Sequence, residues 1–535
     1  MPETSLRPAP VGSRGWLLTF LVCGWGIAPG ALDAQSLAGQ ALWPPRLDQG
    51  QVRFSLLPAF STWDENFGPP GSDPRPLGAG LTSDEAAPLL PGVELLEARL
   101  RELTSTPGYA ARAGGMAGTV RQDFTRVDFS GEMGVFDWLS VGVTVPIVKT
   151  RTEVGLDFQA AVDADLGLSP TQTDAGAVAA FLQAVSQAST SAASHAQAAC
   201  STDPGSATCS SAQALAQEWD AFSSGLDAAY GASIFFPVTS SDVAGLLTAR
   251  LDVLNAGLSA AGLGTVGAAF PFAATPVDEN VIYGLNENPR AGIGGAPFGT
   301  VIPDWTLGDI EVGARLRVLE RGDASGLRYS LYVGGLVRLG TGTSDDPDVF
   351  LDLGSGDGQE DLEGYVTGYL QGGRRFSLGM EGRYGVQHAT ILYRRVAPAE
   401  VIAAPLSSRR LLEWTPGSYR AMAVVPRWYA SPNLALMGSY RWFSRAADRY
   451  AYAPEESFPD LDLSIMEGGT GTTLHEVGLG LSYTTRTSAR GGGISSTPVE
   501  LHARVVRSVA GSGKLTPVAT RAELGILMYR RVFGN

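Results

Sequence analysis

The stretch that decides the fold ends the chain and reads Arg521-Ala-Glu-Leu-Gly-Ile-Leu-Met-Tyr-Arg-Arg-Val-Phe-Gly-Asn535. Alternate positions are apolar: Ala522, Leu524, Ile526 and Met528. The positions between them are mostly polar or glycine: Glu523, Gly525, Tyr529 and Arg531. Leu527 departs from this pattern, because it lies on the polar row. A strand with two such rows and aromatics near its end suits a wall between lipid and water. The alternative is an edge strand of a soluble β-sandwich.

The same period of two recurs along the chain, which favours the membrane alternative. The stretches that alternate are residues 52–63, 127–133, 139–147, 310–318, 329–339, 362–373, 376–387, 418–429, 434–443, 474–485, 499–509 and 521–533. They predict about twelve strands. An even number lets both ends of a barrel lie in the periplasm.

The connections between these stretches alternate in length. Long ones span residues 64–118, 159–304, 341–361, 389–416 and 444–472. Short ones span residues 134–137, 320–326, 372–375 and 430–433. Short periplasmic turns and long outer loops are typical of outer-membrane barrels, whereas a sandwich has no reason to alternate in this way. Two connections fit less well, because 487–496 is long for an inner turn and 510–515 is short for an outer loop.

One face of the predicted strands carries charge that cannot face hydrocarbon. We expect the following residues to line the interior: Asp309, Glu311, Arg315, Arg317, Arg338, Glu363, Tyr365, Tyr369, Glu381 and Arg383. They form either a selectivity lining for a permeating solute or a salt-bridged filler that closes the barrel. About twelve strands leave room for a modest ligand but less than an open porin has.

The first residues predict export. Arg7 and Arg14 precede an apolar run over residues 16–27, and small residues follow up to Ala34. This order is that of a secretory signal, and we expect cleavage after Ala34. An uncleaved interfacial segment is the alternative. Cys23 follows Val22, where a lipoprotein signal needs a small residue, so no lipid anchor is expected.

Composition narrows the class of protein. Elsewhere in the chain there is no run of about twenty apolar residues, which argues against a transmembrane helix. Mean hydropathy is +0.05, as expected when only alternate strand residues meet lipid. The net charge of −15 argues against nucleic acid as a partner.

Residues 159–304 differ from the rest, being rich in Ala, Ser and Gln with helical spacing. The apolar positions with that spacing include Val178, Phe181, Leu182, Val185, Leu215, Trp219, Phe222, Leu226, Tyr230, Val243, Leu247, Leu251 and Leu254. Ser240 or Ser241 is the expected N-cap of the last helix. We expect a helical insertion that emerges on the outer side as a cap or plug; a loosely ordered insertion is the alternative. The resulting division is 1–34 signal, 35–158 first strands and outer loop, 159–304 insertion and 305–535 remaining strands.

Two cysteines remain after the signal is removed. In an oxidising compartment Cys200 and Cys209 are expected to form a disulfide that staples the first two helices of the insertion. Two free thiols are the alternative, and metal binding with the nearby His195 is less favoured.

The loop over residues 341–361 is acidic and rich in glycine. Its carboxylates at Asp345, Asp346, Asp348, Asp352 and Asp357 are weak candidates for calcium, which prefers several oxygen ligands. The spacing does not match an EF-hand, so a solvated acidic loop is favoured and no metal is expected.

Catalysis has little support. The chain contains His195, His388, His475 and His502, but no Gly-x-Ser-x-Gly elbow, phosphate loop or zinc spacing. His388 and His475 fall near predicted outer strand ends, where a Ser/His dyad of a lipid-active enzyme would sit. No cofactor and no enzymatic activity are expected.

Several segments resemble known proteins. Residues 131–146, 307–313 and 339–342 resemble motifs of the MetA-pathway-of-phenol-degradation family of outer-membrane proteins. The terminal strand resembles the closing strand of bacterial outer-membrane barrels, although Phe533 is third from the end rather than last. The family resemblance implies help for aromatic or other hydrophobic compounds in crossing the outer membrane, as in FadL-like channels. It transfers no functional residues, and the insertion is a departure from it.

Together these features predict a monomeric, all-β, transmembrane antiparallel barrel of about 12 strands with an α-helical outer insertion. The expected function is passive uptake of a small hydrophobic or aromatic solute. Expected partners are outer-membrane lipid, that solute, and the barrel-assembly machinery through the terminal strand. The alternatives are a structural or surface-binding protein with a closed lumen and, less favoured, a lipid-active enzyme.

Overall fold

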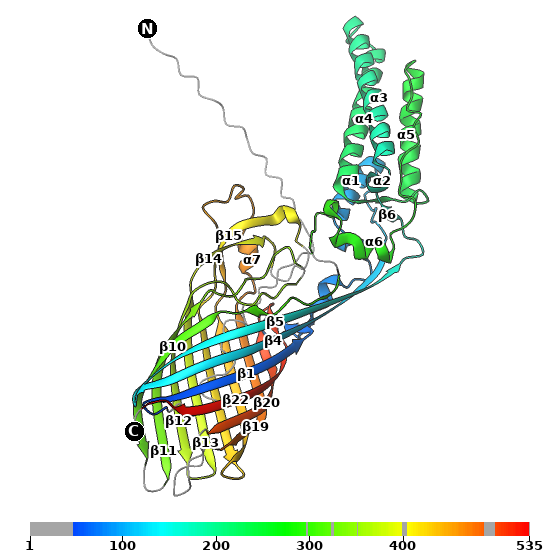
Figure 1. The fold of residues 1–535 in the computed structure, drawn as a ribbon. Coiled ribbons are helices and arrows are strands. Elements are labelled where there is room, and N and C mark those ends of the chain that lie inside the picture. The colour runs from blue at the N-terminus through cyan, green and yellow to red at the C-terminus, as the bar shows by residue number, and fades with distance from the viewer. Residues whose placement is uncertain are drawn as a thin grey trace, which may run out of the picture.

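Twelve antiparallel strands close into one barrel (Figure 1). The computed structural model describes residues 47–295, 298–322, 326–349, 351–398, 404–485 and 498–533. The barrel strands are β1 (Gln51–Trp63), β4 (Gly114–Phe136), β5 (Leu139–Ala160), β10 (Ile310–Gly322), β11 (Leu327–Leu339), β12 (Asp361–Gly372), β13 (Phe376–Gln387), β16 (Tyr419–Tyr429), β17 (Leu434–Arg445), β19 (Thr472–Thr484), β20 (Val499–Ser512) and β22 (Thr520–Arg531). Each pairs with the next in sequence, and β22 returns to β1. The predicted fold class is therefore confirmed. The expected signal segment and the 487–496 connection lie outside the described residues.

The two rows of each strand separate as the alternation predicts. In β22 the side chains of Leu524, Ile526 and Met528 are exposed, whereas those of Glu523 and Tyr529 are buried. The same division holds in β10, where Val312 and Leu316 face outward and Arg315 is buried. An apolar outer row is what lipid requires, because hydrocarbon does not solvate charge.

Strands β4 and β5 continue well beyond the stretches predicted from alternation. On the outward row of β5 the apolar series ends at Ile147, and Lys149, Arg151 and Glu153 follow. This change marks the outer edge of the lipid-facing band, so the remaining residues up to Ala160 project past it. The predicted strands end too early because they were predicted from apolar alternation alone, and the outward row beyond Ile147 is charged.

The wall between β5 and β10 is paired over a short distance. Only six residue pairs, from Thr144–Glu311 to Leu139–Leu316, join the two strands. Farther out, β5 instead pairs with the short strands β9 (Thr306–Leu307) and β8 (Gly299–Val301). The barrel wall therefore closes through residues 139–144 of β5. The outer part of β5 packs against structure that lies outside the barrel.

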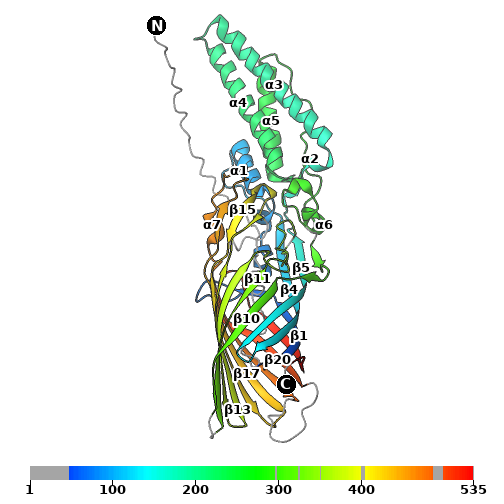
Figure 2. The ribbon, with the colours of Figure 1, turned by 60° about the vertical axis from the view of Figure 1, so that its left-hand side comes forward.

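A helical subdomain stands on the outer ends of β4 and β5. Its helices include α1 (Val93–Thr104), α3 (Ala175–Thr202), α4 (Ala207–Ala232) and α5 (Asp242–Ala260). The three long helices α3, α4 and α5 of residues 159–304 agree with the helical periodicity, whereas α1 comes from the first outer loop and was not predicted. Figures 1 and 2 show α3, α4 and α5 beyond the barrel mouth, so, of the cap or plug that we expected, these three helices do not form a plug inside the barrel.

The subdomain and the barrel rim share one apolar core. It joins Leu96 of α1, Phe181 of α3, Trp219 of α4 and Leu247 of α5 to Phe158 at the outer end of β5. Each of these side chains is buried, and burial of one large apolar side chain stabilises by roughly 1.5–3 kcal/mol. The helices are thus packed on the extended strands rather than tethered to them.

Capping side chains fix where the long helices begin. The Asp174 carboxylate accepts from the Ala177 N–H at the start of α3, and the Ser206 hydroxyl accepts from the Cys209 N–H at the start of α4. Ser241 caps α5 in the same way, which selects between the two serines named from the sequence. No helix in the described part of the chain is long and apolar enough to span a membrane.

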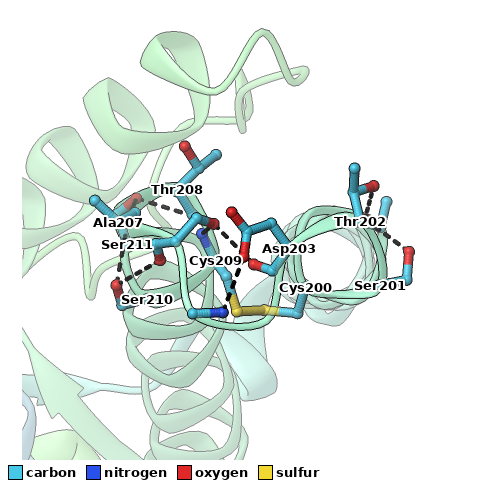
Figure 3. Close-up of a disulfide and its surroundings, with 12 residues drawn as sticks. Cys200, Ser201, Thr202, Asp203, Ala207, Thr208, Cys209, Ser210 and Ser211 are labelled. Carbon is cyan, nitrogen blue, oxygen red and sulfur yellow. Dashed lines mark hydrogen bonds between the residues drawn. A yellow bond between two sulfur atoms is a disulfide. The ribbon is translucent and has the colours of Figure 1, made fainter.

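The predicted disulfide is present. Cys200 in the last turn of α3 bonds Cys209 in the first turn of α4, with 4.7 Å between the Cα atoms (Figure 3). It closes the loop at the tip of the hairpin, where few apolar contacts hold the chain.

Replacing both cysteines by serine should loosen that tip while leaving the barrel folded. Closing a loop of this length stabilises by about 2–3 kcal/mol in the chain-entropy model, and the tip is remote from the barrel wall. Limited proteolysis should then cut within residues 203–206 much faster, whereas heat-modifiable gel mobility of the barrel stays unchanged. Ser201→Ala is the matched control. Unchanged cleavage, or loss of the folded barrel band, would contradict this account.

Candidate functional site: the barrel interior and its outer rim

The inward rows of the barrel meet one another in a narrow interior. Of the ten residues expected to line it, eight have buried side chains: Asp309, Glu311, Arg315, Arg338, Glu363, Tyr365, Glu381 and Arg383. Arg317 and Tyr369 are half-buried. All ten lie on the inward parity of their strands or, for Asp309, directly before β10.

The largest ionic group centres on Arg338 of β11. Its guanidinium lies 3.2 Å from Glu311 of β10 and 2.9 Å from Asp361 of β12. On the next strands Arg383 pairs with Glu363 at 3.0 Å, and the Tyr419 hydroxyl donates to Glu363 at 2.6 Å. These bonds run from strand to strand around the inside of the wall, so each charge is neutralised where water is excluded.

Two further ionic groups occupy other parts of the interior. Arg53 and Arg315 both pair with Glu132, which brings β1, β4 and β10 together. Across the barrel, Arg521 of β22 lies 2.9 Å from Glu476 of β19 and also bonds Glu523. Arg53, Glu476 and Arg521 were not predicted as interior residues. Their signal was available, because each is a charged residue on the inward parity of its strand.

Aromatic side chains cover glycines on the inward rows. A Cβ atom at Gly334 of β11 would fall within the Tyr365 ring, and one at Gly385 of β13 would fall within the Tyr419 ring. The rings therefore lie flat against neighbouring backbone, where only glycine leaves room. This arrangement lets large side chains fill a narrow interior.

An apolar cluster explains the position of Leu527. This residue lies on the inward row and is buried with Leu47, Leu57, Val425 and Tyr529. Val425 belongs to β16 and Leu527 to β22, which are not neighbouring strands, so the cluster reaches across the barrel. The departure from alternation in the terminal strand is thus a filling residue rather than an error of register.

A second apolar cluster lies near the outer mouth. Phe67 of β2 (Glu65–Phe67) packs with Tyr419, Phe443 and Leu474, whose strands β16, β17 and β19 reach the outer rim. A short segment that follows β1 thus covers part of the opening. The arrangement agrees with a filled interior better than with an open selectivity lining.

A cavity lies between these layers. Its volume is about 90 Å³, and its lining includes Arg53, Ser55, Leu57, Asp128, Ser130, Glu132, Ser140, Gly142, Thr144, Glu311, Gly313, Arg315, Leu336, Tyr365 and Leu527. Small residues leave it open, because Gly142 of β5 lies directly opposite Gly313 of β10. The cavity therefore adjoins the short seam between those two strands.

Two carboxylates of the acidic loop form ion pairs above the rim. Asp345 forms two 2.6 Å bonds with Arg394 of β14 (Thr390–Arg395), and Asp348 lies 2.9 Å from Arg395. The Asp352 carboxylate accepts from the Asp346 N–H at 2.9 Å. These carboxylates do not converge on one point, so their weak candidacy as a calcium site is not supported by the geometry.

Asp357 lies apart from the others, at the start of the interior. Burial and the neighbouring carboxylates Asp361 and Asp309 raise the pKa of Asp357 from 3.8 to about 8, with Arg338 opposing the shift. Among the described residues, no three His, Cys, Asp or Glu side chains are grouped as metal ligands.

The histidines do not form a hydrolytic pair. The His475 Nδ1 atom lies 2.8 Å from the Tyr440 hydroxyl on the outward face of the barrel. His502 is buried against Gly525 in the interior. Among the described residues, the backbone N–H of His388 donates to the Glu360 carbonyl at 3.2 Å, and the His475 ring meets a tyrosine rather than a serine.

Comparison with known proteins adds the following. No protein-family model and no curated protein sequence matches the chain. Among solved structures it is similar to an outer-membrane channel of Pseudomonas putida F1, at 7% identity over 92% of this chain and 100% of that one, with a TM-score of 0.39. A Pseudomonas aeruginosa FadL homologue gives 9% identity over 95% and 99%, with a TM-score of 0.25. The P. putida toluene transporter TodX gives 9% identity over 92% of each chain, with a TM-score of 0.24. Likenesses this weak carry no functional argument.

Removing Arg338 should destabilise the barrel strongly. Arg338→Met leaves Glu311 and Asp361 buried without their cation, which costs about 3–5 kcal/mol. The matched control is Arg317→Met, because Arg317 pairs with Glu320 where both are partly exposed, and a loss below about 1 kcal/mol is expected there. Urea unfolding of the refolded protein measures both. Equal losses in the free energy of unfolding for the two variants would contradict the buried position of the Arg338 ion pairs.

Asp357 should make stability depend on pH when divalent cations are chelated. Its folded pKa is raised, so the folded state holds a proton that the unfolded state releases between pH 4 and pH 8. Stability therefore falls as pH rises through this window. Asp357→Asn, which removes the group, should be more stable than the parent protein at pH 8 and similar to it near pH 4. Urea unfolding at several pH values tests this, and a difference that stays constant would refute it.

Proposed function

We propose that the chain is an outer-membrane channel for passive uptake of small hydrophobic or aromatic solutes. The observation that carries this proposal is the interior cavity of about 90 Å³ beside the β5–β10 seam. An apolar cavity of about 150 Å³ can hold benzene, so this smaller cavity, lined by polar as well as apolar side chains, must widen before a solute can enter. Ion pairs elsewhere in the interior oppose free aqueous diffusion.

The surroundings support the same role. The exposed apolar rows of the strands fit contact with outer-membrane lipid, and the terminal strand β22 fits recognition by the barrel-assembly machinery. We place the chain in the bacterial outer membrane as a monomer, with residues 159–304 as an extracellular insertion. The motifs at 131–146, 307–313 and 339–342 support membership of the MetA-pathway-of-phenol-degradation group.

A surface-binding protein with a closed lumen is the second candidate. It is favoured by the filled interior and by the long α3–α4 hairpin, which projects away from the barrel (Figure 2). Lipid-active catalysis has no comparable support, because His475 is bonded to a tyrosine hydroxyl.

Filling the cavity should stop uptake without disturbing the fold. Ser55→Phe places a large ring in the cavity from the inward row of β1, and Leu56→Phe changes the outward row of the same strand as a control. The initial rate of radiolabelled naphthalene uptake by cells carrying each variant should fall several-fold for Ser55→Phe and stay unchanged for the control. Planar-bilayer conductance should be small in every form.

The outcomes separate the two candidates. If the parent protein is folded and gives no uptake above cells that lack it, the transport proposal fails and surface binding by the helical subdomain becomes the better account. If both variants transport like the parent protein, the cavity is not on the path.

A further inference from the structure

Four polar side chains converge where the acidic loop enters the barrel mouth. Asp357 and Gln359 belong to the loop, Asp361 begins β12 and Gln387 ends β13. Asp361 is 0% exposed, Gln359 4%, Gln387 5% and Asp357 9%. The site therefore lies inside the rim, although it is built from a loop and two strand ends.

Each of the four side chains has a buried oxygen without a hydrogen-bond donor. These atoms are Asp357 Oδ1, Gln359 Oε1, Asp361 Oδ1 and Gln387 Oε1. A buried acceptor left unpaired costs about 1–3 kcal/mol, and four such atoms belong here to side chains that are hydrogen-bonded to one another. A positively charged ligand that accepts electron pairs from oxygen satisfies all of them at once.

Hydrogen bonds hold the four side chains in one cluster. The side-chain nitrogens of Gln359 and Gln387 both donate to Asp357 Oδ2 at 3.1 Å, and that of Gln387 also lies 3.4 Å from Asp361 Oδ2. The oxygens without a donor therefore belong to side chains that contact one another.

The charge balance points the same way. Asp357, Asp361 and Asp309 bring three carboxylates to the rim, and Asp309 accepts from the Gly342 and Asp357 N–H groups at 2.7 and 3.1 Å. Arg338 reaches Asp361, but the same guanidinium also serves Glu311. The cluster therefore carries more negative than positive charge in a place that excludes water, and burial raises the pKa of Asp357 accordingly.

The backbone holds the cluster in place. Gly354 and Gly358 adopt positive φ angles of 59° and 69°, which bend the loop back toward the rim. The Ser355 hydroxyl donates to the Leu307 carbonyl at 2.8 Å and ties the loop to the segment before β10. A site whose ligands are fixed before binding loses less entropy when the ion arrives.

We infer that Asp357, Asp361, Gln359 and Gln387 form a binding site for one hard divalent cation of the calcium type. The donor set is two carboxylates and two amide oxygens, which suits calcium rather than zinc. Water completes the coordination. The ion fixes the loop of residues 341–361 over the barrel mouth, and this role does not depend on the transport proposal.

Equilibrium dialysis of the refolded full chain with radiolabelled calcium tests the site. The parent protein should bind one ion per chain. Asp357→Asn should weaken binding at least tenfold, whereas Asp304→Asn, which changes an exposed carboxylate on the same rim, should not alter it.

Gln387→Glu distinguishes an ion from a proton at the site. If a cation binds there, the added carboxylate should tighten calcium binding and raise the unfolding temperature in calcium. If Gln387 only donates to the carboxylates, the same change should lower stability with or without calcium. Absence of saturable binding, or equal affinity in the parent and Asp357→Asn, would overturn the inference. Magnesium that displaces calcium with equal affinity would contradict the calcium-type assignment.

Discussion

The whole structure depends on one constraint: the outer face of a narrow, closed barrel wall contacts lipid, whereas its inner face encloses a polar interior with little water. Lipid takes the outward row, so every charge must lie on the inward row, where there is little water. With twelve strands the inward rows are close enough for side chains to meet from one strand to another. Arg338, Glu311 and Asp361 show the result, because each charge finds its partner on a neighbouring strand. The interior is therefore filled by the same pairing that makes the wall possible.

This constraint shapes what the barrel can do. Ion pairs and the Leu527–Val425 contact occupy the interior in layers, so a broad water-filled pore is not part of the fold. The cavity survives where Gly142 faces Gly313, at the seam that is joined by six residue pairs. Space inside the barrel and weak pairing in its wall thus occur together, next to the strands that carry the helical subdomain.

Much of this followed from the sequence. Strand number, the inward row around Arg315 and Arg383, and the Cys200–Cys209 bond depend on local alternation or on chemistry that few alternatives satisfy. The outer halves of β4 and β5 did not follow, because their outward row is charged beyond Ile147. Strands β14, β15 (Arg409–Thr415) and β18 (Arg449–Tyr452) lay in predicted loops, since short strands leave little periodicity. The sequence also could not show which carboxylates of the acidic loop form ion pairs. Arg394 and Arg395, which pair with Asp345 and Asp348, come from another loop.

Buried carboxylates need positively charged partners both in the barrel interior and at its outer rim, but the two places differ in how many arginines are available. Inside the barrel each carboxylate meets an arginine, and no further ligand is required to explain the charge. At the rim the carboxylates and amide oxygens outnumber the arginines, and four buried oxygens without a donor belong there to side chains that contact one another. Asp357 and its three neighbours each keep one buried oxygen without a donor although their other polar atoms are paired, and a cation at that position would serve all four. The failure of pairing is thus better evidence for a ligand than the number of acidic residues in the loop, which the sequence already displayed.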